Sequence, residues 1–351
     1  MNEREEIILH KMGDISKLLE PDRGRVQNLH GFEEHYTDIV DYIIRSTYRI
    51  WEENGLGLIY DHYQHNVKVW TTEGLMYGRE AVIAASAQTQ AAFPDLRLFG
   101  DEVIWSGNDE DGFHSSHRIT WVGTNTGYSK YGPPTGRRIV RTGIAHCFVQ
   151  ENRVVEEWIA RDEMSLVLQL GYDPVEKARE MAERESELEP LPTGEIERLQ
   201  GQNTPAILPD PPDQFDPEDF VRRAYHEIWN WRLLNKLDQY YSPNHLCHAP
   251  AGRELYGRGA LKAFILSMLS AFPDTALNVD HVAWLGGDTQ GHRVAVRWTL
   301  QGTHTGPGIY GVPTGKSIRL LGINHHLIQN GKFVEEWMSF DEFALLKQIF
   351  R

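Results

Sequence analysis

One segment of the chain occurs twice, and this repeat limits the possible folds more than any other feature of the sequence. The tetrapeptide Ala-Phe-Pro-Asp at 92–95 returns at 271–274, and Val-Glu-Glu-Trp at 155–158 returns at 334–337. Both pairs are separated by 179 positions. A period of that length is a whole domain and not a solenoid unit, so each copy must bury its own core.

The rest of the chain divides around these copies. We expect an N-terminal helical extension over 1–30, a first domain over 31–171 and a second domain over 215–351. Between them, 172–214 begins with a charged helical run and continues with seven prolines between 190 and 217. Because proline neither donates to a ladder nor continues a helix, this stretch is predicted to be a helical and Pro-rich linker.

Within each copy, helical signals come first and strand signals follow. Two apolar helices are expected per copy, at 39–53 and 79–92 and at 220–234 and 258–271. Period-two patterns then predict strands at 96–106, 116–122, 138–150 and 153–161, with counterparts at 277–285, 293–301, 317–329 and 332–339. Asn330-Gly331 predicts a hairpin turn, and Asp162 and Asp341 are expected to cap a short final helix. The predicted fold class is α+β, with helices packed on one face of a mainly antiparallel sheet.

Composition excludes several functional classes. The net charge of -15 disfavours nucleic acid and anionic membranes as partners. No run approaches 18 apolar residues and the start lacks a signal-peptide core, so we expect a cytoplasmic protein without a membrane span. Cys147 and Cys247 have no CxxC neighbour and are expected to be small buried side chains. Nucleotide, serine-hydrolase and zincin motifs are missing from the sequence, and no cofactor or metal is predicted.

Three motifs of the second copy point to a family. They are Arg-Trp-Thr-x-x-Gly-Thr-His-Thr-Gly at 297–306, Gly-x-Pro-Thr-Gly-Lys at 311–316 and Asn-Gly-Lys-x-Val-Glu-Glu-Trp-x-x-x-Asp at 330–341. The chain resembles the SnoaL-like polyketide cyclase, or ester cyclase, family over about 35–171 and 215–351. That family shares the cone-shaped, cystatin-like fold of nuclear transport factor 2, scytalone dehydratase and ketosteroid isomerase. The resemblance implies a curved sheet around an apolar pocket. It also implies a family dimer formed inside one chain, with a further homodimer possible.

The resemblance also predicts where an acid/base pair would lie. Family members place a carboxylate on the last strand and a polar partner on the strand before it, because enolisation needs a base and a donor for the oxyanion. The carboxylate position holds Ile159 in the first copy and Met338 in the second, and the partner position holds Ala145 and Asn324. The first pocket is therefore expected to be apolar, and the second to retain one hydrogen-bonding group.

The sixteen histidines include three pairs spaced by three residues. His245 and His248 are expected in a loop at the mouth of the second pocket, where either is a candidate base or a solvent-facing loop residue. His114 and His117 lie in a predicted strand, which would place them on opposite faces rather than at a metal.

Two matched arginines interrupt strands that otherwise read as core. Arg118 and Arg297 must be paired if buried, either with a structural carboxylate or with an anionic substrate. The expected structural partners are Asp162 or Glu157 in the first copy and Asp341 or Glu336 in the second. Several aromatic residues are candidates for the pocket lining or for plain core packing: Trp284, Trp298, Tyr131 and Tyr310.

Two functional classes remain open. The first is a cofactor-independent lyase, isomerase or cyclase for a hydrophobic or carbonyl-bearing metabolite, placed in the second domain, with Asn324 as oxyanion donor, His248 or His245 as base and Arg297 as anion partner. The second is a non-catalytic small-molecule-binding or interaction protein with degenerate pockets. Two polar groups that converge on one point in a pocket would favour the enzyme, and a filled pocket would favour the alternative.

Overall fold

The computed structural model describes residues 9–10, 24–185 and 208–351, and it divides into two compact units. The first comprises residues up to 71, 75–161 and 166–171, and the second comprises 72–74, 162–165 and 172–351. Most of the expected N-terminal helix and the proline-rich part of the expected linker lie outside the described residues. Leu9–His10 forms a short strand, β1, and 24–30 is not helical.

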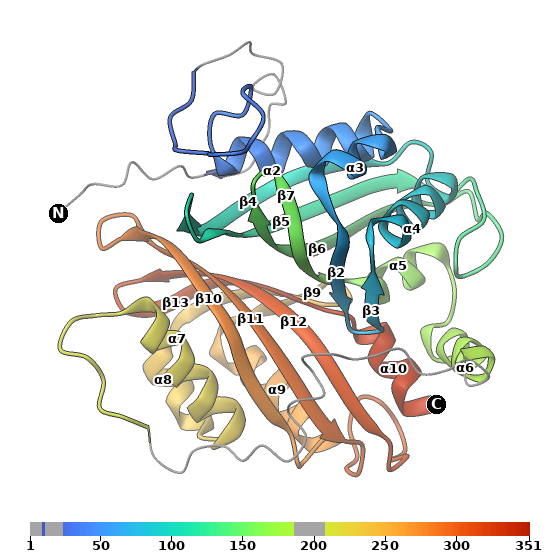
Figure 1. The fold of residues 1–351 in the computed structure, drawn as a ribbon. Coiled ribbons are helices and arrows are strands. Elements are labelled where there is room, and N and C mark those ends of the chain that lie inside the picture. Colours follow the sequence, from blue (N-terminus) through green and yellow to red (C-terminus); the bar gives the residue numbers. More distant parts are fainter. Residues whose placement is uncertain (1–8, 11–23, 186–207) are drawn as a thin grey trace. The chain divides into compact units, whose positions relative to one another are not determined.

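The first unit has one seven-stranded sheet in the order β1-β4-β5-β6-β7-β2-β3. The long strands pair antiparallel, whereas β2 runs parallel to β7, so the sheet is mixed. Figure 1 shows α2, α3 and α4 on one face of this sheet. The elements are α2 (Ile39–Thr47), a π turn (Tyr48–Glu52), α3 (Ile59–His62), β2 (Tyr63–Thr71), β3 (Gly74–Tyr77), α4 (Arg79–Ala92), β4 (Arg97–Asn108), β5 (Gly112–Thr124), β6 (Arg138–Gln150), β7 (Arg153–Arg161) and α5 (Glu163–Leu170).

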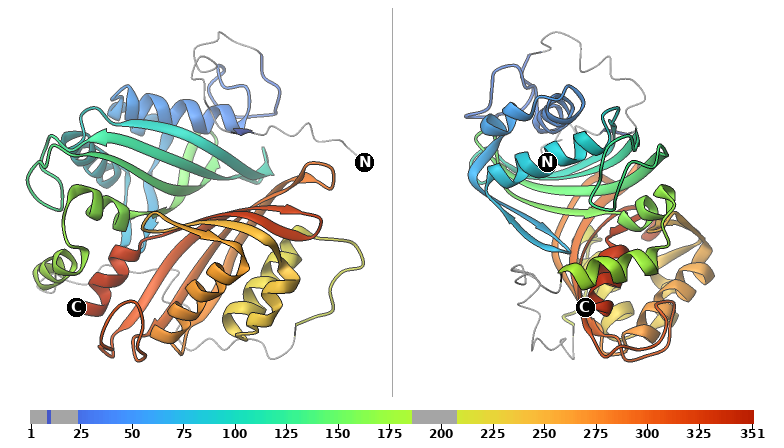
Figure 2. Two further views of the ribbon diagram at one scale, coloured as in Figure 1. Left: turned by 180° about the vertical axis from the view of Figure 1, so that it is seen from behind. Right: turned by 90° about the vertical axis from the view of Figure 1, so that its right-hand side faces the viewer.

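The second unit repeats this plan with a six-stranded sheet in the order β10-β11-β12-β13-β8-β9. Its helices α7, α8 and α9 again lie on one face of the sheet (Figure 2). The elements are α6 (Pro174–Glu185), α7 (Pro217–Tyr225), a π turn (His226–Asn230), α8 (Leu237–Tyr240), β8 (Tyr241–Ala249), β9 (Arg253–Tyr256), α9 (Gly257–Ala271), β10 (Ala276–Gly287), β11 (Gly291–Thr303), β12 (Ser317–Gln329), β13 (Lys332–Phe340) and α10 (Glu342–Phe350). The predicted tandem α+β fold is confirmed.

Local sequence signals account for the strand and helix ends. Asn330 and Gly331 both have positive φ, at 51° and 65°, which is the backbone that a tight hairpin turn between β12 and β13 requires. Asp341 caps α10 by accepting from the Ala344 amide at 2.7 Å, and Asp162 accepts from the Ser165 amide at 3.0 Å. The two first helices end alike: each passes through a π turn to a residue with positive φ, Asn54 or Arg232.

Candidate functional site

The first domain encloses a cavity of about 120 Å³ between its helices and the inner face of its sheet. A cavity of about 150 Å³ is known to hold one benzene ring, so this space has the scale of a single ring. The wall on the sheet side comes from β5, β6 and β7, and the wall on the helix side from α2, the following π turn and α4. Several polar and aromatic side chains belong to its lining: Trp51, His62, Tyr63, His117, Trp121, Arg141, Cys147, Glu157 and Arg161.

Glu157 is the one carboxylate among the described residues that line this cavity. Its Oε2 accepts a hydrogen bond from the Tyr63 hydroxyl at 3.2 Å, and the Cys147 thiol also bonds to it. Burial raises the pKa of Glu157 to about 7, and the charge of Arg161 together with these two hydrogen bonds limits the rise. A carboxyl group with that pKa is present in both protonation states near neutral pH, as a general acid/base requires.

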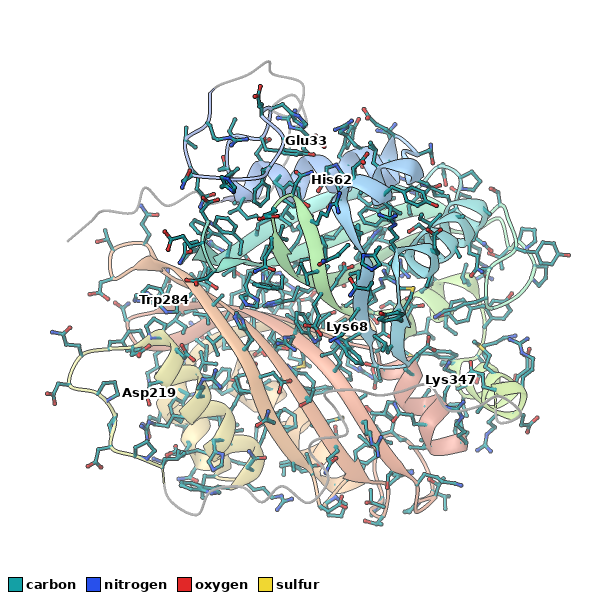
Figure 3. All side chains as sticks on the ribbon, in the orientation of Figure 1. Glu33, His62, Lys68, Asp219, Trp284 and Lys347 are labelled. Carbon is teal, nitrogen blue, oxygen red and sulfur yellow. The ribbon has the colours of Figure 1, made fainter. Side chains whose placement is uncertain are left out.

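His62 lies next to Tyr63 in the sequence and lines the same cavity. It ends helix α3 and is labelled in Figure 3. Burial lowers its pKa, so the imidazole is neutral at pH 7. The Tyr36 hydroxyl lies 3.3 Å from its Nε2. Tyr63 and His62 thus place neutral polar groups on the same cavity as Glu157.

The opposite end of the cavity is formed by two arginines and a tryptophan. The guanidinium carbon of Arg141 lies 5.0 Å from the ring centroid of Trp121, and that of Arg161 lies 6.0 Å from it. Gly143 makes this arrangement possible, because a Cβ there would come within 2.9 Å of the Trp121 ring. The cavity therefore has a carboxyl end, a middle that includes Ala145 and Ile159 with His117 opposite Ala145, and a cationic end.

The corresponding space in the second domain is nearly full, with about 20 Å³ left. That is room for about one water molecule. Glu336 occupies the position of Glu157 and accepts a hydrogen bond from Asn324 Nδ2 at 2.5 Å. Asn324 Oδ1 in turn accepts from Trp298 Nε1 at 2.9 Å, and His245 Nε2 lies 3.5 Å from Glu336. Burial raises the pKa of Glu336 to about 8.

The difference in volume comes from a few exchanged side chains. Where α4 presents Ala85, Ser86 and Thr89 to the cavity, α9 presents Phe264, Ile265 and Met268 at the positions 179 residues later. The tryptophan on the strand that crosses the cavity also has a different position in the two copies. Ile119 of the first domain corresponds to Trp298, whose ring packs directly over Gly322. The second interior is therefore closed by apolar packing around a hydrogen-bonded carboxyl group.

This buried carboxyl group predicts a pH dependence of stability. The pKa of Glu336 is raised on folding, so the native state binds the proton more tightly and its contribution to stability is complete below about pH 4.5. That contribution is lost as the pH rises through about 8. We expect Glu336→Gln to become progressively more stable than the wild type between these limits, by up to about 1 kcal/mol per pH unit. Urea unfolding midpoints across this range test it, with Glu110→Gln on the surface as a control that should leave the slope unchanged.

The structure places some of the predicted site residues at the cavities. Ala145 and Ile159 are paired across β6 and β7 and line the first cavity. Asn324 and Met338 are paired across β12 and β13 and line the small second one, together with Trp298. Asn324 donates from Nδ2 to Glu336 and accepts at Oδ1 from Trp298, and its role as an oxyanion donor stays a prediction.

Other predicted residues lie elsewhere. His245 and His248 belong to strand β8 and not to a loop. His245 is fully buried, and burial lowers its pKa to about 4. His248 is partly exposed, with Nδ1 2.8 Å from Glu254, Nε2 3.1 Å from Glu335 and its ring stacked on Trp337. It does not line the second cavity.

Both predicted arginines face away from the cavities. Arg297 lies next to Trp298 on β11, and because side chains alternate along a strand it points to the opposite face. Arg118 likewise alternates with the cavity residues His117 and Ile119. It lies 3.7 Å from Glu102 and 3.8 Å from Asp101, two structural carboxylates other than the expected Asp162 or Glu157.

Three predicted aromatic residues are not part of either lining. Tyr310 donates from its hydroxyl to Glu342 at 2.9 Å in the core of the second domain, and Tyr131 is buried outside the first cavity. Trp284 lies near the end of β10 with 42% of its surface exposed (Figure 3). His114 and His117 point to opposite faces of β5, as their spacing predicts, with His114 Nδ1 3.1 Å from His146 Nε2.

Glu157 and Glu336 were not predicted as pocket groups. The signal was available: Val-Glu-Glu-Trp occurs in both copies, and its second glutamate lies two residues before the expected carboxylate position. Alternation along the strand places residues 157 and 159 on the same face. The pocket carboxyl group is thus one alternation step away from the predicted position. The cavity sizes also point to the first domain, whereas the sequence favoured the second.

These observations define a class: a domain of helices packed on one face of a mixed sheet, present twice in one chain, with a ring-sized cavity in the first copy. The model of the family described as "SnoaL-like polyketide cyclase" matches residues 42–170 and 219–349. The chain belongs to this family and carries two copies of its domain. No curated protein matches the chain. Within the described residues, no helix combines the length and apolarity needed to cross a membrane.

Solved structures resemble one domain of the chain at a time. IdmH from Streptomyces antibioticus is 24% identical, with a TM-score of 0.33, and the match covers 38% of this chain and 99% of IdmH. TsrD from Streptomyces laurentii is 24% identical with a TM-score of 0.33, covering 39% of this chain and 98% of TsrD. A SnoaL-like polyketide cyclase from Agrobacterium tumefaciens is 17% identical with a TM-score of 0.32, covering 39% and 99%.

Proposed function

We propose that the first domain is a cofactor-independent enzyme that moves a proton next to a carbonyl group of a small ring-bearing metabolite, as an isomerase, lyase or cyclase does. The observation that carries the proposal is the buried carboxyl group of Glu157 on a ring-sized cavity, with a pKa of about 7. Removal of a proton next to a carbonyl requires a base of that strength within reach of the carbon. Polyketide cyclases of this family carry out chemistry of this kind, which supports the reaction class.

The neighbouring groups suit the same reaction. Tyr63 donates to Glu157 and would hold the carboxylate in position, and the neutral imidazole of His62 can hydrogen-bond an oxygen without adding charge. The apolar middle of the cavity excludes water from the reacting carbon, which keeps the carboxyl pKa high. The second domain, with its interior filled, fits a structural role and not a second active site.

The pH dependence of proton exchange tests the proposal. The probe is cyclohexanone, a ketone of one ring. NMR in heavy water measures the exchange of its α-hydrogens for deuterium. Because Glu157 must be ionised to accept the proton, the enzymatic rate should rise about tenfold per pH unit below about 7 and level off above it. A rate equal to that of buffer alone, or one unchanged between pH 5 and pH 9, would count against the proposal.

A further inference from the structure

The cationic end of the first cavity has no counterpart in the second domain. The positions that hold Arg141, Arg161 and Trp121 in the first copy hold Leu320, Phe340 and Leu300 in the second, each 179 residues later. Both copies nevertheless form the same strands with the same pairing. The strand pairing therefore does not require two guanidinium groups at this place.

Burying a guanidinium group costs free energy of folding. Arg141 is 9% exposed, and a guanidinium group loses hydration when it is buried. Both guanidinium groups line the cavity, as does the carboxyl group of Glu157. Guanidinium groups bind planar carboxylates through paired hydrogen bonds, and both of these groups lie over the ring of Trp121, which lines the same cavity.

The strand register sets the distance between the two ends of the cavity. Glu157 and Arg161 are four residues apart on the same face of β7, which separates their Cα atoms by about 13 Å. Ala145 and Ile159 form the apolar stretch between them. A one-ring molecule that lies in the cavity between these residues would have an anionic group toward Arg161, a ring in the middle and an acidic C–H bond toward Glu157.

We infer that Arg141 and Arg161 form a subsite for an anionic group, so that the substrate class of the first domain is a small ring-bearing carboxylic acid with an adjacent carbonyl group. The inference rests on the proposed function for the reacting end of the molecule, but the subsite itself is a matter of binding. It is therefore testable without turnover.

Calorimetric titration with two probes of matched shape tests the subsite. Benzoate should bind the wild type at least about tenfold more tightly than the neutral benzamide, and the preference should weaken as salt is added. In the Arg141→Gln, Arg161→Gln double variant the two probes should bind equally. Arg138→Gln, an exposed change on the same strand, is the control and should keep the preference. Arg161→Lys, with Arg141 intact, keeps both positive charges and should keep most of the preference for benzoate. This variant tests the subsite even if the double variant does not fold.

Two results would overturn the inference. The first is a wild type that binds both probes equally or binds neither. The second is a double variant that keeps the full preference for benzoate. Glu157→Gln separates this test from that of the proposed function. It should retain the benzoate preference while losing cyclohexanone exchange. A benzoate preference without any exchange in the wild type would reject the proposed reaction and leave the subsite standing, and exchange without the preference would do the reverse.

Discussion

Glu157→Gln is expected to lower the rate of cyclohexanone α-hydrogen exchange by two to four orders of magnitude. General acid/base groups contribute about 10²–10⁴-fold to a rate, and glutamine has the shape of glutamate but cannot accept the proton. The hydrogen bond from Tyr63 retains an acceptor, because the amide oxygen can replace Oε2. The fold should therefore survive, and the loss should appear in the rate and not in the binding of a neutral ring.

The repeat supplies a matched control for this variant. Glu336 occupies the same position in the second domain, is as deeply buried and has a raised pKa, but the cavity beside it holds only about 20 Å³. Glu336→Gln should leave the exchange rate within about twofold of the wild type. If the two variants lose exchange equally, or if Glu157→Gln keeps it, the assignment of the acid/base group to Glu157 is wrong.

Much of the fold was readable from the sequence because the repeat and the periodic patterns agree. The strands at 138–150 and 153–161 and the helix at 79–92 begin and end where the pattern predicts. The parallel pairs were missed. The side chains of strand β2 divide among buried, half-buried and exposed positions, with Val67 and Val69 among the buried ones, and its partner lies about ninety residues later, so its local sequence carries little of the strand signal.

The site was harder to predict because its volume depends on pairs of distant residues. Whether a cavity exists is decided by Ala85 on α4 facing the sheet in one copy and Phe264 on α9 in the other, and no local pattern reports that difference. The two carboxyl groups were misread for a related reason. The expected position was taken from the family pattern, whereas the strand register of β6 and β7 places Glu157 opposite Cys147, one pair further along.

The duplicated chain thus keeps one buried carboxyl group in each copy but gives it different surroundings. In the first copy it meets a cavity, a tyrosine hydroxyl and a cationic end. In the second it is hydrogen-bonded to Asn324 in a filled core, where a carboxyl group of raised pKa lowers stability at alkaline pH. On the proposed function, the side chains of one helix and one strand assign the first copy to catalysis and the second to a structural role.

Exchanging one residue between these helices should exchange the properties of the two interiors. Ala85→Phe places in the first cavity the ring that Phe264 places in the second, and a cavity of about 120 Å³ has little room for both that ring and a ligand. We expect benzoate binding and cyclohexanone exchange to fall on the order of a hundredfold or more, with no loss of stability beyond the modest cost of repacking.

The reciprocal change, Phe264→Ala, should lower the free energy of unfolding by about 3–5 kcal/mol and leave exchange intact, because it opens a void in a packed core. Ala84→Phe adds the same ring to the exposed face of α4 and should change neither property. Urea unfolding, titration and NMR exchange on the three variants decide the matter, and retention of ligand binding in Ala85→Phe would show that the cavity beside Glu157 is not where small molecules bind.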